Sequence, residues 1–566
     1  MATAPEPVCV THGMRARSPD VERWEQLRVM NSSIGAAVRR LSNIFLALLL
    51  IISAVAAYIQ VSDRAFFNGP LLAESETYNA NGHCPPYDAA MRGTIYDRNG
   101  VKLAWSVQDP NATCGYRRVY ADPTLSPLIG YFSYKYGTAG IEATYDDELS
   151  GAQSGVTVQQ VTNHLLHKPQ YGQDIYLTID DKLQQYINQI YNSSAIFGGV
   201  CQPDGSDPPG AIVVENPNNG EILAMVSRPY YDANKIDQSG YFQQLQSDPS
   251  FPLLNRASQG LYDPGSTFKT VTLSASINEG VTSLTSTYSK DDATHFVANG
   301  EHIDWVDYLN GQWQNAQFPL TVQDSYAYSD NTVYARLATQ LGADKWLQYA
   351  RAFGISTPGQ GMAQAKDVGF DAPSNQSQAF NALTNGQPTQ FGPNLLAESG
   401  FGQGQLLISP LTMATVASTV AANGYLYTPH VGLKTVPNGV ASSSVLPNAP
   451  TVYDQVLRPE TAQAMRQAMW AVSQYGTGSA GLGPHNGYYV YNSPAHMGGK
   501  TGTAQTDQAN PETWWIGVAP DDAAGAGSGP AKYAIALLKE HSGEGACQVY
   551  VANDTMLYAL QHNIGY

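Results

Sequence analysis

Two groups of strand-like segments lie far apart in this chain and enclose a mainly helical block. The first is the hairpin GAIVVENPNNGEILAMVS at residues 210–227, in which an Asn-Pro-Asn-Asn-Gly turn joins two apolar strands. The second comprises HMGGKTGTAQT, ETWWIGVAP and KYAIALLKE near the C-terminus, and the flexible sequence DDAAGAGSGP separates the last two. Between the groups, residues 260–480 are mainly helical in pattern, and a final helix is expected from about Ala546 to Gln561. This order predicts an α+β domain whose sheet joins both ends of the domain.

The chain upstream of the hairpin has a different pattern. Residues 62–173 are rich in Gly, Pro, Asn and Tyr and contain short alternating segments but no long amphipathic helix. In this region MRGTIYDRNGVKLA, at residues 91–104, predicts a strand, a turn and a return strand. At Asp174 the pattern changes to the strand-like DIYLTID, and a helix over residues 180–191 is expected to follow. We therefore expect a β-rich N-terminal domain at residues 62–173 and a second domain at residues 174–566.

An uncharged, mostly apolar run, LSNIFLALLLIISAVAAYIQV, extends from Leu41 to Val61. A helix needs about 20 residues to cross a bilayer, whereas the apolar part of a cleaved signal peptide has about 7 to 15 residues. Arg39 and Arg40 directly precede the run, and an excess of basic residues marks the cytoplasmic side. We expect a cytoplasmic tail at residues 1–40, a single transmembrane helix at residues 41–61, and the remainder of the chain outside the cytoplasm.

Composition excludes some classes of function. The formal net charge is −17 at pH 7, whereas nucleic-acid binding needs basic patches, so we expect no nucleic-acid partner. Hydrophobic residues make up 43% of the chain, as in a globular protein rather than a disordered one. His164 and His167 are three residues apart but have no nearby acidic or cysteine ligands, so no metal site is predicted there. We expect neither a metal nor another cofactor.

The five cysteines fit this topology. Cys9 is expected in the reducing cytoplasm, whereas the other four are expected in an oxidising space, where four cysteines allow three pairings. We favour a pairing of Cys84 with Cys114 in the first external region. Cys201 would then pair with Cys547, and these two flank the second domain. Four free thiols are the alternative that the sequence leaves open.

The segment PGSTFK, Pro264 to Lys269, contains a candidate nucleophile. Pro264 and the glycine after it place Ser266 at or near the first turn of a helix, where backbone amides favour a developing negative charge. Lys269 is three residues further on and is expected on the same helix face. A serine hydroxyl needs a base to take its proton, and a lysine serves only when burial or a neighbouring cation lowers its pKa. Lys500 is the candidate cation, whereas the plain alternative for Lys269 is a solvated lysine.

The segment SDN, Ser329 to Asn331, lies where a turn leads into a helix. Ser329 and Asn331 flank Asp330, and they can share one face if this start is not helical. Ser329 would then relay a proton to a leaving amine, and Asn331 would hydrogen-bond a peptide substrate. The plain alternative is an N-cap, for which Ser, Asp and Asn are preferred residues.

The segment KTGT lies in a strand and follows Gly498 and Gly499. We expect these small residues to let another backbone, such as that of a peptide substrate, lie alongside the strand. The ammonium and the hydroxyls of the segment can bind a terminal carboxylate. The Thr503 amide, together with the Ser266 amide, is predicted to form an oxyanion hole. The predicted substrate-binding residues of this strand are Lys500, Thr501, Gly502 and Thr503.

The order of these motifs, Ser-x-x-Lys, Ser-x-Asn and Lys-Thr-Gly, is that of penicillin-recognising active-serine enzymes. Longer blocks are more specific, and they include MRGTIYDRNGVKLA, GIEATYDDELSG (residues 140–151), DIYLTIDDKLQQ, NRASQGLYDPGSTFK and GFGQGQLLISPLTMA (residues 400–414). On these blocks the chain resembles class B penicillin-binding proteins from the apolar run to the C-terminus, and particularly the actinobacterial PbpA-like type. The tail before Met30 is not part of the resemblance, and Met30 is an alternative start.

The resemblance implies a fold and a reaction at the cell membrane. The fold would be a penicillin-binding, serine β-lactamase-like transpeptidase domain, α+β with an antiparallel sheet flanked by helices. A membrane anchor and a non-catalytic pedestal, similar to a dimerisation domain, would precede it. Ser266 would attack the penultimate D-Ala of a peptidoglycan stem peptide ending in D-Ala-D-Ala, and an amine of a neighbouring stem would resolve the ester. β-Lactams would trap Ser266, and a membrane-embedded SEDS-type glycan polymerase is the implied partner of the anchor and pedestal.

Other interpretations of the motifs fit less well. A class A β-lactamase needs a glutamate in a Glu-x-x-Leu-Asn context, and neither Glu398 nor Glu460, the two glutamates between the SDN and KTGT segments, has it. A class D enzyme usually has a hydrophobic residue in place of Asn331. A bifunctional protein would need a glycosyltransferase domain, for which residues 62–173 are too few. A D,D-carboxypeptidase and a non-catalytic scaffold for a glycan polymerase stay open.

Overall fold

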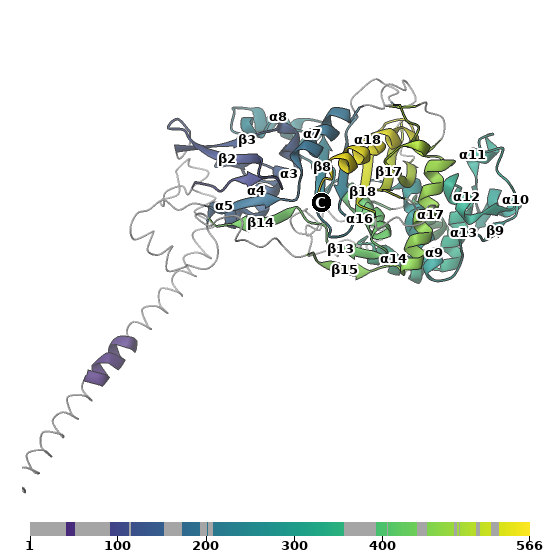
Figure 1. Cartoon of the computed structure of the whole chain (residues 1–566), viewed down its shortest axis with the longest axis horizontal. Helices are drawn as coiled ribbons and strands as arrows, with labels where there is room; N and C mark the ends of the chain where they lie inside the picture. The colour runs from purple at the N-terminus through teal and green to yellow at the C-terminus, as the bar shows by residue number, and fades with distance from the viewer. Residues whose placement is uncertain are drawn as a thin grey trace, which may run out of the picture. The chain divides into compact units, whose positions relative to one another are not determined.

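The computed structural model of the chain, shown in Figure 1, describes residues 41–50, 91–112, 115–151, 172–192, 201, 208–355, 392–404, 406–437, 450–479, 484–485, 487–504, 510–521 and 531–566. The chain divides into two compact units, Met1–His83 and Cys84–Tyr566, and each is described by itself.

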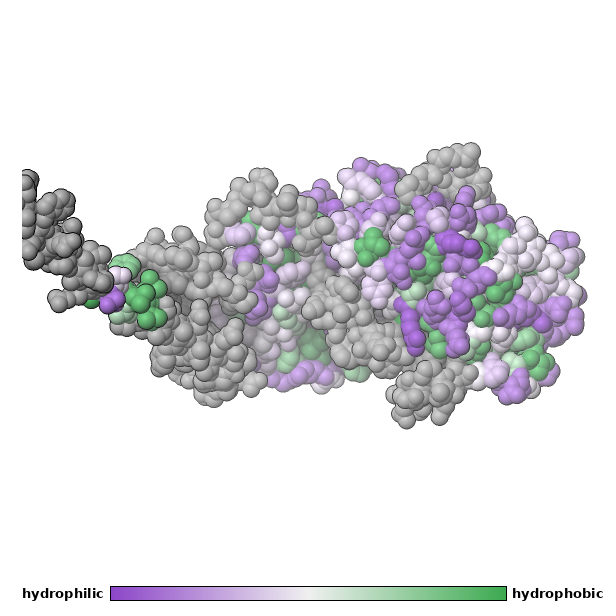
Figure 2. Space-filling view, turned by 90° about the horizontal axis from the view of Figure 1, so that it is seen from below, coloured by the Kyte–Doolittle hydropathy of each residue, from purple (hydrophilic) through white to green (hydrophobic). Residues whose placement is uncertain are grey.

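In the first unit the described residues, 41–50, are helical. Their side chains are exposed, and Figure 2 shows this segment mostly in green, the colour of hydrophobic residues. The rest of the expected tail and transmembrane helix, residues 1–40 and 51–61, lies outside the described residues. Within the described part of the chain, no helix is both long enough and apolar enough to span a membrane. The transmembrane helix stays a prediction.

A five-stranded sheet in the second unit has the order β14-β6-β1-β2-β3. Its strands are β1 (Ile95–Tyr96), β2 (Lys102–Gln108), β3 (Tyr116–Tyr120), β6 (Asp174–Leu177) and β14 (Gly432–Val436). β1 and β2 are the antiparallel pair expected from MRGTIYDRNGVKLA, and β1 runs parallel to β6, the strand expected from DIYLTID. β14 comes from the block expected to be helical, so the sheet contains strands from both sides of the expected boundary between residues 173 and 174. That boundary stays a prediction.

A buried ion cluster ties a short helix to this sheet. The elements after β3 are η2 (Pro123–Leu125), α3 (Ser126–Ile129), β4 (Phe132–Ser133), β5 (Gly137–Thr138), α4 (Gly140–Thr144) and α5 (Asp146–Ser150). Glu142 of α4 is fully buried and accepts hydrogen bonds from Arg92 and from Arg118 of β3, with 2.7 Å between Arg118 Nε and Glu142 Oε1. Burial acts to raise the pKa of Glu142, but the two guanidiniums outweigh it and hold the pKa below its ordinary value. The carboxylate therefore stays charged and joins the helix to the sheet.

The second sheet is antiparallel and has the order β16-β17-β18-β7-β8. Its strands are β7 (Gly210–Glu215), β8 (Ile222–Arg228), β16 (Gly498–Ala504), β17 (Glu512–Ala519) and β18 (Tyr533–Lys539). β18 pairs with β7, so the expected joining of the hairpin to the C-terminal strands is confirmed. Nearly all residues of these strands are buried.

Long helices pack against this sheet. α16 (Pro410–Ala421) contacts β7, β17 and β18, and α18 (Ala546–His562) contacts β17, β18 and α7 (Asp181–Ile190). In Figure 1 α18 is the yellow helix beside β17 and β18. Each residue of α16 is buried, as expected for a helix that is surrounded by the core. The expected bounds of α7 and α18 agree with the structure to within one residue. Asp180 caps α7 by accepting a hydrogen bond from Leu183 N at 3.0 Å.

The block between the strand groups is mainly helical, as expected, but it contains more strands than the sequence indicated. Besides α16, its described helices are η4 (Ala233–Lys235), α8 (Tyr241–Ser247), η5 (Gly265–Phe268), α9 (Lys269–Asn278), α10 (Lys290–Thr294), α11 (Val306–Leu309), α12 (Val322–Ala327), α13 (Asn331–Leu341), α14 (Ala343–Ala352), α15 (Pro393–Gly400), α17 (Pro459–Gln474) and η11 (Val490–Asn492). Small antiparallel pairs join β9 (Thr287–Tyr288) to β12 (Leu320–Thr321), β10 (His295–Ala298) to β11 (Glu301–Asp304), and β13 (Tyr425–Tyr427) to β15 (Val452–Gln455). β15 is exposed along its whole length, so it lacks the apolar alternation that reveals a strand.

A disulfide joins Cys201 to Cys547, with a sulfur–sulfur distance of 2.00 Å. This confirms the second of the two expected pairs. Cys9, Cys84 and Cys114 lie outside the described residues, so the first pair stays a prediction. Cys547 belongs to the first turn of α18, and the disulfide therefore anchors the start of that helix.

Replacing Glu142 with glutamine should destabilise the β14-β6-β1-β2-β3 sheet, because the buried Arg118 loses the carboxylate of its ion pair and the buried Arg92 keeps only its pair with the half-exposed Asp146. We expect the free energy of unfolding to fall by about 3 to 5 kcal/mol, measured by urea denaturation followed by circular dichroism. The control is Asp232→Asn, which removes only the surface pair with Lys235 and should have a much smaller effect. Equal effects of the two variants would contradict this role of the buried cluster.

Candidate active site

The helix that carries the candidate nucleophile begins with a short 3-10 turn. Ser266 lies in η5, and α9 follows at Lys269. A 3-10 helix has three residues per turn, so side chains at positions i and i+3 lie one above the other. Lys269 Nζ accordingly donates a hydrogen bond to Ser266 Oγ at 2.9 Å. The two side chains are as close as expected, but the 3-10 turn aligns them rather than an α-helical face.

Two glycines allow this turn to approach its neighbours. Gly265 has a φ of +52°, and a Cβ placed on it would lie 2.9 Å from Thr503 O. Gly402 has a φ of +90°, and its Cβ would lie 1.8 Å from Gly265 O. Both positions therefore need glycine, for backbone conformation and for space. The turn that holds Ser266 thus lies between β16 and the loop of Gly402, which belongs to the block GFGQGQLLISPLTMA.

The SDN segment joins α12 to α13: Ser329 and Asp330 lie between the two helices, and Asn331 is the first residue of α13. Asp330 caps α13, and its Oδ1 accepts a hydrogen bond from Thr332 N at 2.7 Å. Ser329 has a φ of +61°, outside the right-handed helical region. Lys269 Nζ donates to Ser329 Oγ at 3.1 Å and to Asn331 Oδ1 at 2.7 Å. The N-cap interpretation therefore holds for Asp330, whereas its two neighbours share one face toward the lysine.

The KTGT segment supplies a second lysine to the same hydroxyl. Lys500 Nζ donates hydrogen bonds to Ser329 Oγ at 2.8 Å and to Thr501 O at 3.0 Å. Ser329 Oγ therefore lies between two amine groups, one from α9 and one from β16. Thr501 Oγ1 lies 2.6 Å from Thr477 Oγ1, and Thr503 is the exposed residue of β16. Three segments that are far apart in the sequence thus converge on one place.

Among the described strands, β16 lies at an edge of its sheet, because the strand order begins with it. An edge strand presents unpaired backbone groups to which an extended peptide can add. The two glycines before the KTGT segment do not provide this opening, contrary to expectation. A Cβ on Gly498 would lie 2.0 Å from Asp521 Oδ2, and one on Gly499 would lie 2.1 Å from Cζ2 of Trp515. The space that these glycines leave is filled by side chains of the chain itself.

Burial dominates the electrostatics of the two lysines, both of which are fully buried. Burial lowers the pKa of Lys269 to about 7, although the carboxylates of Asp330 and Asp307 oppose this shift. Burial also lowers the pKa of Lys500 well below its ordinary value, and the charge of Lys269 lowers it further. Asp330 is buried too, and burial raises its pKa to about 7 against the opposing effect of Lys269. Of the two expected causes, burial and the Lys500 cation, burial is therefore the one that lowers the pKa of Lys269.

Two tyrosine rings beside the lysines were missed by sequence reasoning. Lys269 Nζ lies 5.6 Å from the ring centre of Tyr334, and Lys500 Nζ lies 5.7 Å from that of Tyr326. Aromatic faces attract cations, so these rings offset part of the cost of burying the charged amines. The only signal in the sequence is that both tyrosines flank the SDN segment, in QDSYAYSDNTVY.

The described site offers a hydroxyl nucleophile beside an amine whose pKa is close to neutrality, and it adds a second hydroxyl and a second amine. This set can activate a serine for attack on a carbonyl group. Within the described ranges, no His, Cys, Asp and Glu side chains form a group of three or more that could hold a metal ion. His164 and His167 lie outside the described residues.

Known proteins resemble the chain over most of its length. Residues 210–536 match the penicillin binding protein transpeptidase domain, and residues 92–175 match the penicillin binding protein A dimerisation domain. The peptidoglycan D,D-transpeptidase PbpA of Mycolicibacterium smegmatis is 27% identical over 495 residues, which cover 83% of this chain and 89% of that protein. The peptidoglycan D,D-transpeptidase MrdA of Escherichia coli is 28% identical over 385 residues, which cover 66% of this chain and 55% of MrdA.

Solved structures share the fold. The D,D-transpeptidase domain of a peptidoglycan glycosyltransferase from Eggerthella lenta has a TM-score of 0.63 and 26% identity, over 84% of this chain and 99% of that one. PBPA from Mycobacterium tuberculosis has a TM-score of 0.68 and 24% identity, over 84% of this chain and 100% of that one. The expected α+β penicillin-binding fold is therefore confirmed. Because the transpeptidase match spans more than half of the chain, including all three motifs, the chain belongs to the penicillin-binding protein transpeptidase family.

Proposed function

We propose that this chain is a membrane-anchored peptidoglycan D,D-transpeptidase that cross-links stem peptides through an acyl-enzyme on Ser266. The observation that most supports this is the position of Lys269 Nζ between two hydroxyl oxygens, 2.9 Å from that of Ser266 and 3.1 Å from that of Ser329. Membership of the transpeptidase family supports the reaction. The relatives named peptidoglycan D,D-transpeptidases support the substrate class, stem peptides ending in D-Ala-D-Ala.

Lys269 acts as the base of acylation in this proposal. Its neutral amine takes the proton of Ser266 Oγ, which attacks the carbonyl carbon of the penultimate D-Ala. The amides of Ser266 and Thr503 stabilise the oxyanion that forms. As the peptide bond breaks, the Ser329 hydroxyl, which is hydrogen-bonded to both lysines, gives its proton to the nitrogen of the terminal D-Ala and receives from Lys269 the proton that Lys269 took from Ser266. The products are an ester on Ser266 and free D-Ala.

The free edge of β16 binds the donor peptide in this proposal. An extended stem would add to the edge strand through backbone hydrogen bonds, and Asn331 would donate a further bond to it. The terminal carboxylate would contact the amine and the hydroxyls of the edge. Because burial lowers the pKa of Lys500, an arriving carboxylate would favour its charged form. The residues assigned to this binding are Lys500, Thr501, Gly502 and Thr503, and β-lactams would occupy the same place and acylate Ser266.

The second half of the reaction separates this proposal from two alternatives. An amine of a neighbouring stem attacks the ester and forms a cross-link, whereas attack by water would make the enzyme a D,D-carboxypeptidase. A non-catalytic scaffold would form no ester. Mass spectrometry of the products, after incubation of the full chain with a stem-peptide donor and an amine acceptor, distinguishes the three.

The expected boundaries give the proposed organisation of the chain. They are a cytoplasmic tail at residues 1–40, a transmembrane helix at residues 41–61, a pedestal at residues 62–173 and the transpeptidase domain at residues 174–566. The dimerisation-domain match at residues 92–175 supports the pedestal, and the transpeptidase match at residues 210–536 supports the last domain. The catalytic domain would lie outside the cell membrane.

The anchor and pedestal are proposed to bind a SEDS-type glycan polymerase. The full chain should then co-purify with such a polymerase in detergent, and a chimera with a foreign membrane anchor should lose part of that binding. A chimera that binds as well as the native chain would refute an interface carried by the anchor.

Ser266→Ala should abolish covalent labelling of the full chain by benzylpenicillin, because it removes the attacking oxygen. Lys269→Ala should slow acylation by about 10²- to 10⁴-fold, the usual contribution of a general base. Intact-mass spectrometry over several hours measures both. The matched control is Ser274→Ala, since Ser274 is buried in the same helix and its hydroxyl has no hydrogen-bond partner in the described structure. Labelling that persists in Ser266→Ala would mean that the nucleophile lies elsewhere.

The acylation rate should rise with pH through about 7, because only the neutral amine of Lys269 accepts a proton and its pKa is about 7. Asp330→Asn should move this rise to lower pH. The Asp330 carboxylate opposes the lowering of the lysine pKa, so its loss lets that pKa fall further, while asparagine still caps α13. Stopped-flow acylation rates across the pH range test this, with the exposed Asp291→Asn in α10 as control. A pH-independent rate, or a rise that moves to higher pH in Asp330→Asn, would contradict Lys269 as the base.

A further inference from the structure

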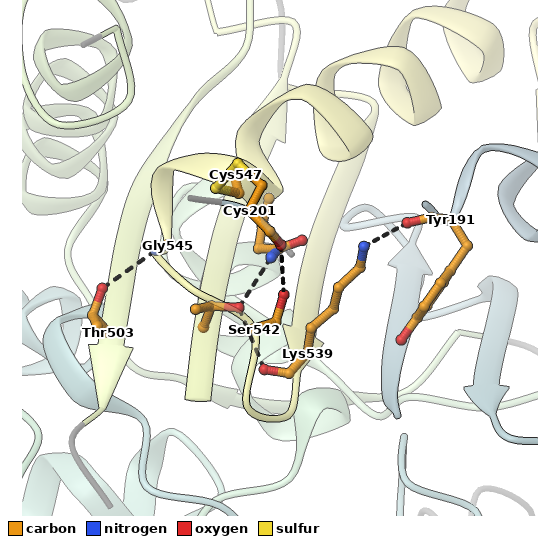
Figure 3. The surroundings of a disulfide bond; sticks show 9 residues. Tyr191, Cys201, Thr503, Lys539, Ser542, Gly545 and Cys547 are labelled. Atoms are coloured by element: carbon orange, nitrogen blue, oxygen red, sulfur yellow. Dashed lines mark hydrogen bonds between the residues drawn. A yellow bond between two sulfur atoms is a disulfide. The ribbon is translucent and has the colours of Figure 1, made fainter. Parts of the chain in front are cut away.

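The start of α18 lies directly against the KTGT segment of β16. Gly545, the residue before the helix, donates a hydrogen bond from its backbone nitrogen to Thr503 Oγ1 at 3.3 Å (Figure 3). A Cβ on Gly545 would lie 2.3 Å from Gly502 O, so a larger residue could not approach the strand as closely. This contact involves the exposed threonine of the segment.

The same helix turn is fixed to the neighbouring strand. Gln548 Nε2 donates a hydrogen bond to Thr513 Oγ1 at 3.0 Å. Thr513 of β17 is the register partner of Thr503 in β16. The first turn of α18 therefore contacts both strands at one level of the sheet.

The disulfide holds this turn in place. Gly545 has no side chain, so α18 lacks the side-chain cap that usually fixes the start of a helix. Two residues further on, Cys547 is bonded to Cys201, and both cysteines are fully buried. Ser542 Oγ donates a hydrogen bond to Cys201 O at 3.2 Å, so the loop before the helix is tied to the same point (Figure 3). A covalent bond thus restrains the position of this first turn.

We infer that Gly545 and the Cys201–Cys547 disulfide position the Thr503 hydroxyl for the substrate carboxylate. A threonine hydroxyl carries one hydrogen and two acceptor positions. Thr503 Oγ1 already accepts a hydrogen bond from the Gly545 N–H, and that contact sets the orientation of the hydroxyl. The hydrogen of the hydroxyl is therefore directed to another acceptor. An anionic carboxylate at the edge of β16 would be that acceptor. The inference rests on the proposed function, because it deepens the role of the same site.

The test compares two acylating agents that differ at the carboxylate. Benzylpenicillin carries the anion, whereas its methyl ester does not. In the full-length Cys201→Ser/Cys547→Ser variant, the acylation rate constant for benzylpenicillin should fall about tenfold, the size expected for one hydrogen bond to a charged group. The rate constant for the ester should stay unchanged, so the ratio of the two should fall by the same factor. Gly545→Ala, which keeps the disulfide but displaces the helix start, should lower the ratio in the same way.

The ratio separates positioning from a general loss of structure. A general disturbance of the site would lower the acylation rate constants of both agents by the same factor. Such an equal decrease in either folded variant would overturn the inference. So would an unchanged ratio. If the double cysteine variant does not fold, Gly545→Ala decides, and Cys9→Ser is the control for a cysteine change outside this network. A wild-type chain that benzylpenicillin does not acylate would instead refute the proposed function.

Discussion

The candidate site depends on one hydroxyl that two lysines share. Lys269 of α9 and Lys500 of β16 donate hydrogen bonds to Ser329 Oγ at 3.1 and 2.8 Å. Both lysines are fully buried, so each must find acceptors within the protein. The turn between α12 and α13 supplies several of them, and three segments are therefore held together at one place. The same burial brings the pKa of Lys269 to about 7, so the interaction that organises the site also sets its chemistry.

Close approaches of backbone support this shared contact. Gly265, Gly402 and Gly545 lie where a Cβ would meet a backbone oxygen of another segment, at 2.9, 1.8 and 2.3 Å. Because these positions lack side chains, the turn of Ser266, the loop of Gly402 and the start of α18 can pack directly on one another or on β16. Acyl transfer needs its reacting groups within hydrogen-bond distance, and such packing keeps them there. The disulfide to Cys547 extends this support to the side of β16 that faces the start of α18.

Elements that carry their own pattern were predicted well. The β7–β8 hairpin and α18 each show a complete local signal, namely two apolar strands around a turn and a long segment without Gly or Pro. The pairing of β18 with β7 was expected because the strands of both groups need neighbouring strands to complete their backbone hydrogen bonds. β14 was missed, since a short strand is stabilised by its partner β6 rather than by its own residues. The expected pairing of Cys201 with Cys547 was one of several options until the packing decided it.

The sequence by itself determined which reactive groups the chain has and the order in which they occur, because a motif is a property of neighbouring residues. It therefore identified Ser266 and the lysines of two motifs as candidates. Only the tertiary structure decided what each residue contacts. Asp330 caps a helix while Ser329 contacts both lysines, and Gly499 makes room for a tryptophan ring rather than for a peptide. Burial, hydrogen-bond partners and pKa depend on residues that are distant in the chain, so no local pattern contains them.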